Sequence, residues 1–242
     1  MKTVITDRWV YDGNSEHTIV GADAYARTDR WRFSKVAPPI LTKHERGKRK
    51  TRSDVKRLLL LLIIQHEGPI GRYRLKTLLG MAMHEGIVRH MLEEYQAQGY
   101  ITSTRRGASL TPRGQDHLQT LLRQYRIQDV QKIAISLMST YPTTIGMHLD
   151  NCADRITSAM DLRDKAVRGG ATGATIIIFR NGVLTIPTVD PLFITKNPTF
   201  TNQLKATFAL KPNDLIVLIS ADTEWKGLEA AVHVAVSLSD EL

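Results

Sequence analysis

Arginine and lysine side chains are concentrated in residues 71–114, where apolar residues otherwise recur mostly at helical spacing. Guanidinium and ammonium groups donate hydrogen bonds to phosphate, and guanidinium can also pair with the edge of guanine. Basic side chains in this pattern favour binding of a polyanion. The candidate contact residues are Arg72, Arg74, Lys76, His84, Glu85, Arg89, His90, Arg105, Arg106 and Arg113.

The charge of the chain is distributed unevenly around these residues. Residues 43–126 hold 17 Lys/Arg against 7 Asp/Glu, whereas residues 1–42 hold 6 against 5 and residues 127–242 hold 10 against 12. Each of these arginines alone would be typical of an ordinary solvated surface. Their concentration in one third of the chain indicates a local electrostatic footprint.

Helices and a hairpin are expected to position the basic residues. "SDVKRLLLLLIIQHEG" predicts a helix that begins at Ser53 or Asp54 and ends before Gly68 and Pro69. It is apolar nearly all round, so we expect it to be buried. "GRYRLKTLLG" predicts a short second helix ending at Gly80.

The chain that follows predicts a third helix, a hairpin and a fourth helix. "MAMHEGIVRHMLEEYQAQGY" has apolar residues at helical spacing and a terminating Gly99. "YITSTRRGASLT" alternates on either side of a turn at residues 105–107, as two strands would. Pro112 opens the last helix, "PRGQDHLQTLLRQY".

Three helices, a hairpin and a helix are the element order of a winged helix-turn-helix. Residues 53–126 resemble the DNA-binding domain of archaeal and bacterial winged-helix regulators. In this resemblance "RLKTLLG" fills the helix before the turn, "MHEGIVRHMLEEYQAQGYI" the recognition helix and its exit, and "RRGASLTPRG" the wing. The resemblance implies binding of duplex DNA and no particular operator.

A recognition helix presents its N-terminal half to base edges in the major groove. Met83, His84, Glu85, Arg89 and His90 are then expected near DNA, with Arg89 the best candidate for guanine. Ile87, Val88, Met91 and Leu92 are expected to hold the helix to the core. Glu85 either accepts from cytosine or stabilises the helix N-terminus, and the second role is favoured.

The other basic residues are expected at the DNA backbone. Arg72, Arg74 and Lys76 lie on the preceding helix, Arg105 and Arg106 at the wing tip, and Arg113 just beyond it. Residues 43–52, "KHERGKRKTR", form a linker or a DNA-tracking arm, and residues 1–42 an extension.

Residues 127–242 predict a mixed α/β domain for effector binding or dimerisation. Strands are expected at 131–138, 143–149 and 214–220, helices at 153–170, 200–210 and 223–238, and a hairpin across Asn181 and Gly182. In whole-chain layout the protein resembles archaeal winged-helix regulators whose C-terminal domain has no assigned chemistry. That resemblance rests on "RDKAVRGGATGATIIIFRNGVLTIP" and the element order.

Catalytic or metal chemistry is not expected. "RGGATGAT" follows a helix and precedes a strand, which is the wrong order for a phosphate loop. "HLDNC" lacks a fourth metal ligand, and Ser220, Asp222 and His233 lack a nucleophile elbow. Asp222 and Glu224 are interpreted as a helix N-cap and a first-turn acid. Cys152 is the single cysteine, so no internal disulfide is expected.

The sequence therefore predicts an α+β protein: an N-terminal winged helix-turn-helix followed by a separate α/β domain. We expect a cytoplasmic archaeal-type transcriptional regulator that is no enzyme, needs no cofactor or metal, and binds double-stranded DNA. A homodimer and a small-molecule effector are expected as well, with no membrane contact. Two alternatives stay open: an enzyme fused to a DNA-binding domain, and a winged-helix module for RNA or protein contact.

Overall fold

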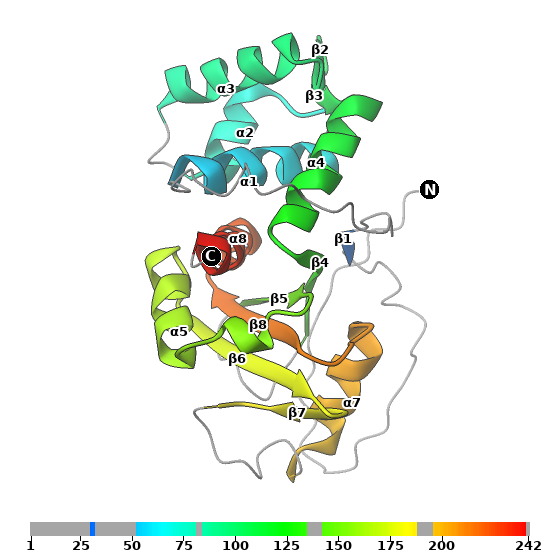
Figure 1. Cartoon of the computed structure of the whole chain (residues 1–242). Coiled ribbons are helices and arrows are strands. Elements are labelled where there is room, and N and C mark those ends of the chain that lie inside the picture. The colour runs from blue at the N-terminus through cyan, green and yellow to red at the C-terminus, as the bar shows by residue number, and fades with distance from the viewer. Residues whose placement is uncertain (1–29, 32–51, 81–83, 135–141, 188–195, 241–242) are drawn as a thin grey trace, which may run out of the picture.

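The structure, a computed structural model, describes residues 30–31, 52–80, 84–134, 142–187 and 196–240. Helices in these ranges pack around a six-stranded sheet and a separate two-stranded sheet (Figure 1). Each pairing between described strands is antiparallel. The described chain is therefore of the α+β class.

The first part, residues 52–126, is called the helical half below. It contains, in order, α1 (Arg52–Glu67), α2 (Arg72–Leu78), α3 (Glu85–Ala97), β2 (Ile101–Thr104), β3 (Gly107–Leu110) and α4 (Pro112–Gln124). This is the element order expected from the sequence. The expectation that α1 is buried is confirmed as well, because every side chain from Leu58 to Ile64 is at most 2% exposed.

The start of α4 explains why the hairpin and the last helix pack closely. Pro112 occupies the first turn, and the Thr111 side chain accepts a hydrogen bond from the Gly114 backbone N–H at 3.0 Å. A Cβ atom on Gly114 would lie 1.9 Å from the Tyr100 carbonyl oxygen. Glycine at this position therefore lets α4 begin directly against the chain that leads into the hairpin.

The second part, residues 127–240, is called the sheet half. Its elements are β4 (Ile127–Lys132), β5 (Thr143–Leu149), α5 (Ala159–Arg168), β6 (Gly173–Arg180), β7 (Val183–Thr185), α7 (Pro198–Thr207), β8 (Asp214–Ala221) and α8 (Glu224–Asp240). The short strand β1 (Arg30–Trp31), from the predicted N-terminal extension, pairs with β4. The strand order is β1-β4-β5-β8-β6-β7.

Two expected elements differ most from those observed, whereas the helix expected at 200–210 is shifted by two to three residues, as α7. The strand expected at 131–138 is instead β4, which runs from Ile127 to Lys132 and shifts its register against β5 between Ile127 and Asp129; residues 135–138 lie outside the described ranges. The helix expected at 153–170 is shorter, because Ser158 caps α5 by accepting a hydrogen bond from the Asp161 N–H at 3.2 Å. Residues 153–155 form a separate 3-10 turn.

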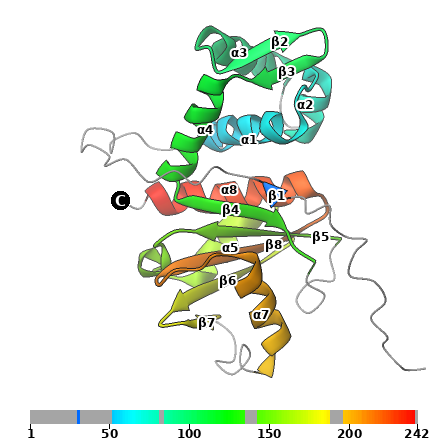
Figure 2. The same cartoon turned by 90° about the vertical axis from the view of Figure 1, so that its right-hand side faces the viewer.

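Helix α8 forms a layer between α1 and the sheet (Figure 2). Alternate residues of β8 face opposite sides of the sheet: Val217 and Ile219 pack in the cluster that contains α8, and Ile216 and Leu218 in the cluster that contains α7. The first cluster also includes buried residues of α1, α2, α3 and α4. The predicted division into two domains at residue 126 stays a prediction, and the buried core runs continuously across it.

A lysine links three helices within this shared core. Lys56 of α1 is 7% exposed, and its ammonium group donates to the Leu79 carbonyl oxygen at the end of α2 and to the Glu229 carboxylate of α8, the latter at 2.7 Å. A buried ammonium group is tolerated only when it is paired and hydrogen-bonded. Lys56 therefore connects the chain that leads into α3 with the helix that covers the sheet.

Replacing Glu229 with glutamine is expected to lower the free energy of unfolding by about 1–3 kcal/mol, because Lys56 then keeps only neutral partners. The midpoint of urea unfolding, followed by circular dichroism, measures this change. Asp222→Asn is the control, because Asp222 pairs with Lys226 at 2.9 Å while both side chains are 57% exposed. We expect a change below about 0.5 kcal/mol there, and an equally small change for Glu229→Gln would show that the buried pair contributes nothing.

None of the described helices is long and apolar enough to cross a membrane.

Candidate nucleic-acid interface

Most of the predicted contact residues lie on helices α2 and α3. Leu75 and Leu79 are fully buried and fix α2 to the core, whereas Arg74 on the other side has a side chain that is 67% exposed. Lys76 is half-buried in the last turn of α2. Viewed in Figures 1 and 2, α3 and the β2–β3 hairpin lie at the end of the molecule farthest from the six-stranded sheet.

Helix α3 has one buried face and one exposed face. Val88, Met91 and Tyr95 are buried, and Leu92 is partly buried against the same core. The opposite face exposes Gly86, Arg89, His90 and Glu93, and His84 is exposed at the N-cap. The exposed face of the N-terminal half therefore carries Arg89 and His90, with His84 at its start, whereas Glu85 is half-buried; Met83 lies outside the described residues.

The structure corrects the expectation for Ile87. It was expected to hold α3 to the core, but it is 45% exposed. Steps of 100° per residue place it at the edge of the stripe formed by Val88, Met91 and Tyr95. Helical spacing alone includes such border positions in an apolar face.

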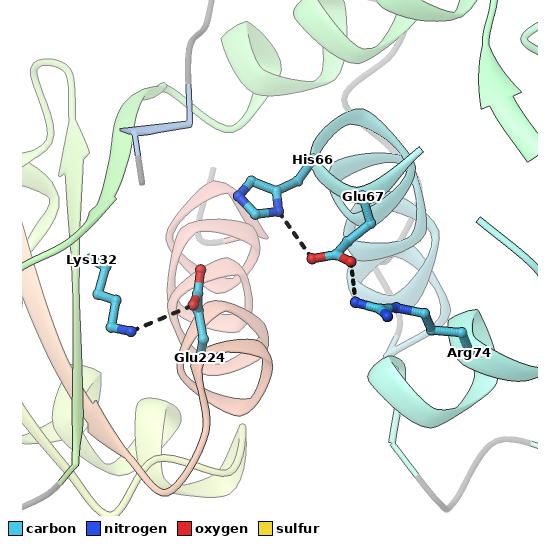
Figure 3. A network of polar contacts seen from close by, with 5 residues as sticks. All are labelled: His66, Glu67, Arg74, Lys132 and Glu224. Carbon is cyan, nitrogen blue, oxygen red and sulfur yellow. Dashed lines mark hydrogen bonds and ion pairs between the residues drawn. The ribbon is translucent and has the colours of Figure 1, made fainter. Parts of the chain in front are cut away.

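Two ion pairs fix the approach of α2 to its neighbours. Arg72 at the start of α2 pairs with Glu85 in the first turn of α3, with 3.0 Å between Nη2 and Oε1. Arg74 pairs with Glu67 at 2.5 Å, and Glu67 lies 3.4 Å from Nδ1 of His66 (Figure 3). Glu85 thus has two structural roles: it lies in the first turn of α3, and it binds Arg72 of α2.

Figure 3 also shows how close this network lies to the sheet half. His66 projects from the last turn of α1 toward α8, where its ring lies edge-on to Trp225 at 5.7 Å between centroids. Glu224, in the first turn of α8, pairs with Lys132 of β4 at 3.9 Å. The end of α1 that holds Arg74 is thus packed against the start of α8.

Arg105 and Arg106 form the two-residue tip of the β2–β3 hairpin. Both side chains are exposed, and neither makes an ion pair with another residue in the described ranges. The Arg106 backbone N–H donates to the Thr104 hydroxyl at 3.2 Å, which steadies the turn. The hairpin thus holds two uncompensated positive charges at the end of the molecule.

The hairpin is anchored to the connection between α1 and α2. Ile70 and Ala108 exchange two backbone hydrogen bonds, of 3.0 and 2.9 Å. Gly107 adopts a φ of +127°, and a Cβ there would lie 2.3 Å from the Ile70 carbonyl carbon. Arg113, just after the hairpin, is exposed and lies 5.6 Å from the centroid of the Tyr100 ring.

Some residues of this surface were missed by sequence reasoning. Tyr73 is 69% exposed on α2, and the guanidinium of Arg72 lies 5.4 Å from the centroid of its ring. Arg57 of α1 and Glu94 of α3 make a bidentate pair with two distances of 2.8 Å, and these bonds hold the pKa of the Glu94 carboxyl below its ordinary value. Tyr73 could have been included from the sequence, because it stands between two arginines. The pair of Arg57 and Glu94 could not, because 37 residues separate its members.

The rest of the described chain offers weaker candidates. A pocket of about 300 Å³ lies between α1, α3 and α4, with Tyr95 and His117 in its wall. The rings of Tyr100 and His117 stack there at 4.0 Å, and burial lowers the pKa of His117. The described residues include no group of three His, Cys, Asp or Glu side chains suited to hold a metal ion.

The "HLDNC" segment has a structural explanation. His148 is 4% exposed and its Nε2 atom lies 2.6 Å from the carboxylate of Asp214, which is 1% exposed. Burial raises the pKa of the Cys152 thiol to about 11. The expected cap of α8 also changes, because the Thr223 hydroxyl accepts from the Lys226 N–H at 3.3 Å, while Asp222 pairs with the Lys226 side chain.

Comparison with known proteins adds a family match for the sheet half. The segment from β5 to α8, which carries the buried histidine–aspartate pair, contains the matching sequence. Residues 142–238 match the family described as Domain of unknown function (DUF4443). The DUF4443 match does not include the helical half, and no curated protein matches the chain.

A solved structure resembles most of the chain. The hypothetical protein PH0730 from Pyrococcus horikoshii OT3 is 23% identical, and the match covers 78% of this chain and 93% of that one with a TM-score of 0.57. At this identity the likeness concerns the fold alone. The chain thus shares an α+β fold with an archaeal protein.

Proposed function

We propose that this chain is a sequence-specific DNA-binding transcriptional regulator whose residues 53–126 act as a winged helix-turn-helix. The observation that carries the proposal is the exposure of Arg89, His90, Arg105 and Arg106 on the N-terminal half of α3 and at the hairpin tip, at the end of the molecule farthest from the six-stranded sheet, with Arg74 exposed on the adjacent α2. The Ile70–Ala108 pairing supports it, because it fixes the hairpin beside the helix pair. Residues 43–51 of the proposed arm lie outside the described ranges.

In the proposed complex α3 enters the major groove, and Arg89 is its main base-reading residue. Arg89 lies 3.8 Å from Glu93, with side chains 63% and 66% exposed, so this weak pair can open when DNA binds. Arg74, Lys76 and Arg113 contact phosphates, and Arg105 and Arg106 reach phosphate or the minor groove.

The full chain is expected to bind duplex DNA with an affinity that falls steeply with salt. Four to six phosphate contacts would give a slope of about −4 to −5 for log affinity against log salt concentration, because bound cations displace condensed counterions. Fluorescence anisotropy with a labelled duplex at several salt concentrations measures this slope. Binding that is insensitive to salt, or tight binding of RNA with none of duplex DNA, would contradict the proposal.

Within this function, Arg89→Ala is expected to lower discrimination between the preferred site and other duplexes by about 1–3 kcal/mol. Selection of bound sequences from a random duplex pool supplies the preferred site, and competition binding measures the ratio. Arg113→Ala is the comparison, since loss of a phosphate contact weakens binding to all duplexes alike. If Arg113→Ala altered the sequence preference and Arg89→Ala did not, α3 would not be the reading helix.

A homodimer and a small-molecule effector that acts through residues 127–242 remain part of the proposal. A dimer would place two reading helices about one helical turn of DNA apart. The mass of the full chain in solution tests the dimer.

A further inference from the structure

Gly86 is the second residue of α3 and lies on its exposed face. Arg89 and His90 follow three and four residues later, so all three side-chain positions lie on the same side of the helix. They occupy the half of α3 that the proposed function places in the major groove.

The fold gives no reason for a glycine at this position. Gly86 is not among the residues with positive φ, and a Cβ atom built on it would meet nothing within 4 Å. Gly114 and Gly107 differ in this respect, because a Cβ would collide with backbone in both cases. Glycine within a helix is destabilising relative to alanine, so Gly86 lowers stability without a packing benefit.

We infer that Gly86 is the point of closest approach between the α3 backbone and the duplex. This inference rests on the proposed function. A glycine is suited to such a point because its missing side chain lets the backbone come close to a ligand. Close contact here brings Arg89 and His90 near the base edges and makes Gly86 a determinant of how deeply α3 enters the groove.

The test combines stability and affinity in the full chain. Gly86→Ala is expected to raise the melting temperature by about 1–4 °C, because alanine restricts the unfolded chain and favours the helix. The same change is expected to weaken binding to duplex DNA about tenfold, and Gly86→Leu about a hundredfold, because the added atoms occupy space filled by the duplex. Thermal unfolding and fluorescence anisotropy give the two readouts.

Ala97→Leu is the matched control. Ala97 is exposed in the last turn of the same helix, eleven residues after Gly86, so it lies on the same face about 16 Å further along the axis. This end of a recognition helix points away from the bases. The affinity of Ala97→Leu is expected to stay within about twofold of the unsubstituted chain.

The outcomes separate the inference from the proposed function. A more stable Gly86→Ala chain that binds duplex DNA as tightly as the unsubstituted chain would overturn the inference and leave the proposed function in place. A less stable Gly86→Ala chain would also overturn the inference, because it would show that the fold itself requires glycine at this position. An unsubstituted chain that fails to bind any duplex would overturn both.

Discussion

Reversing both charges at the hairpin tip, with Arg105→Glu and Arg106→Glu together, is expected to weaken binding to every duplex by about a hundredfold or more. Both side chains are exposed and have no ion-pair partner among the described residues, so their charges are available to phosphate. The substitution removes two attractive contacts and adds two repulsive ones. Anisotropy titrations at fixed salt measure the loss.

The control for this variant reverses two exposed arginines of α5, Arg163→Glu with Arg168→Glu. The change in net charge is the same, but the positions belong to the sheet half. We expect less than about a threefold loss, because exposed charges beyond a Debye length are largely screened. Equal losses in both variants would mean that binding depends on net charge and that the hairpin is not a contact site.

Replacing Asp214 with alanine is expected to lower the free energy of unfolding by about 3–5 kcal/mol, the largest effect on stability. Its carboxylate accepts hydrogen bonds from the backbone N–H of Asn151 at 3.0 Å and of Lys211 at 2.7 Å, and it contacts His148 at 2.6 Å. The substitution removes the buried acceptor that these three partners share. Urea unfolding at neutral pH measures the change, and an effect below about 1 kcal/mol would contradict this account.

The contribution of Asp214 also depends on pH. Burial by itself would raise the pKa of its carboxyl, but hydrogen bonds from His148, Asn151 and Lys211 outweigh it and lower the pKa. The stabilisation is therefore fully present above the ordinary carboxyl pKa of about 3.9 and is lost as the pH falls through the lowered value. Asp214→Asn is expected to differ most from the unsubstituted chain at neutral pH, and a gap that widened below pH 4 would contradict this.

Local patterns in the sequence were sufficient for most element positions. The glycine and proline residues at 68 and 69 and Pro112 mark helix ends where they were expected, and the hairpin across Asn181 and Gly182 is formed. Ile87 and Asp222 were misjudged because their roles depend on what lies beside them in space. In a sequence pattern, an apolar residue at the border of a helix face cannot be distinguished from one in the core. Asp222 and Thr223 are likewise adjacent, and both residue types can cap a helix.

Long-range pairs were beyond prediction from the sequence. His148 and Asp214 are 66 residues apart, and Lys56 and Glu229 are 173 apart. Neither pair has a local signal, because register across a sheet and contact between helices determine which charges meet. The exposure of Arg89 and His90 on α3 was easier to predict, since exposure on a helix face follows from periodicity.

The position of α1 has a consequence for how the molecule melts. Its apolar side chains contribute to one buried cluster together with residues of α8 and of the sheet, so neither half can lose its structure without exposing the other. Cooperative units of this kind open together and give coincident transitions by different probes. Cutting the chain at residue 126 would expose the apolar face of α1 on one fragment and the apolar face of α8 on the other. The two halves are therefore unsuited to domain exchange. The sheet half of another protein could replace this one only if it reproduced the surface that α8 presents to α1.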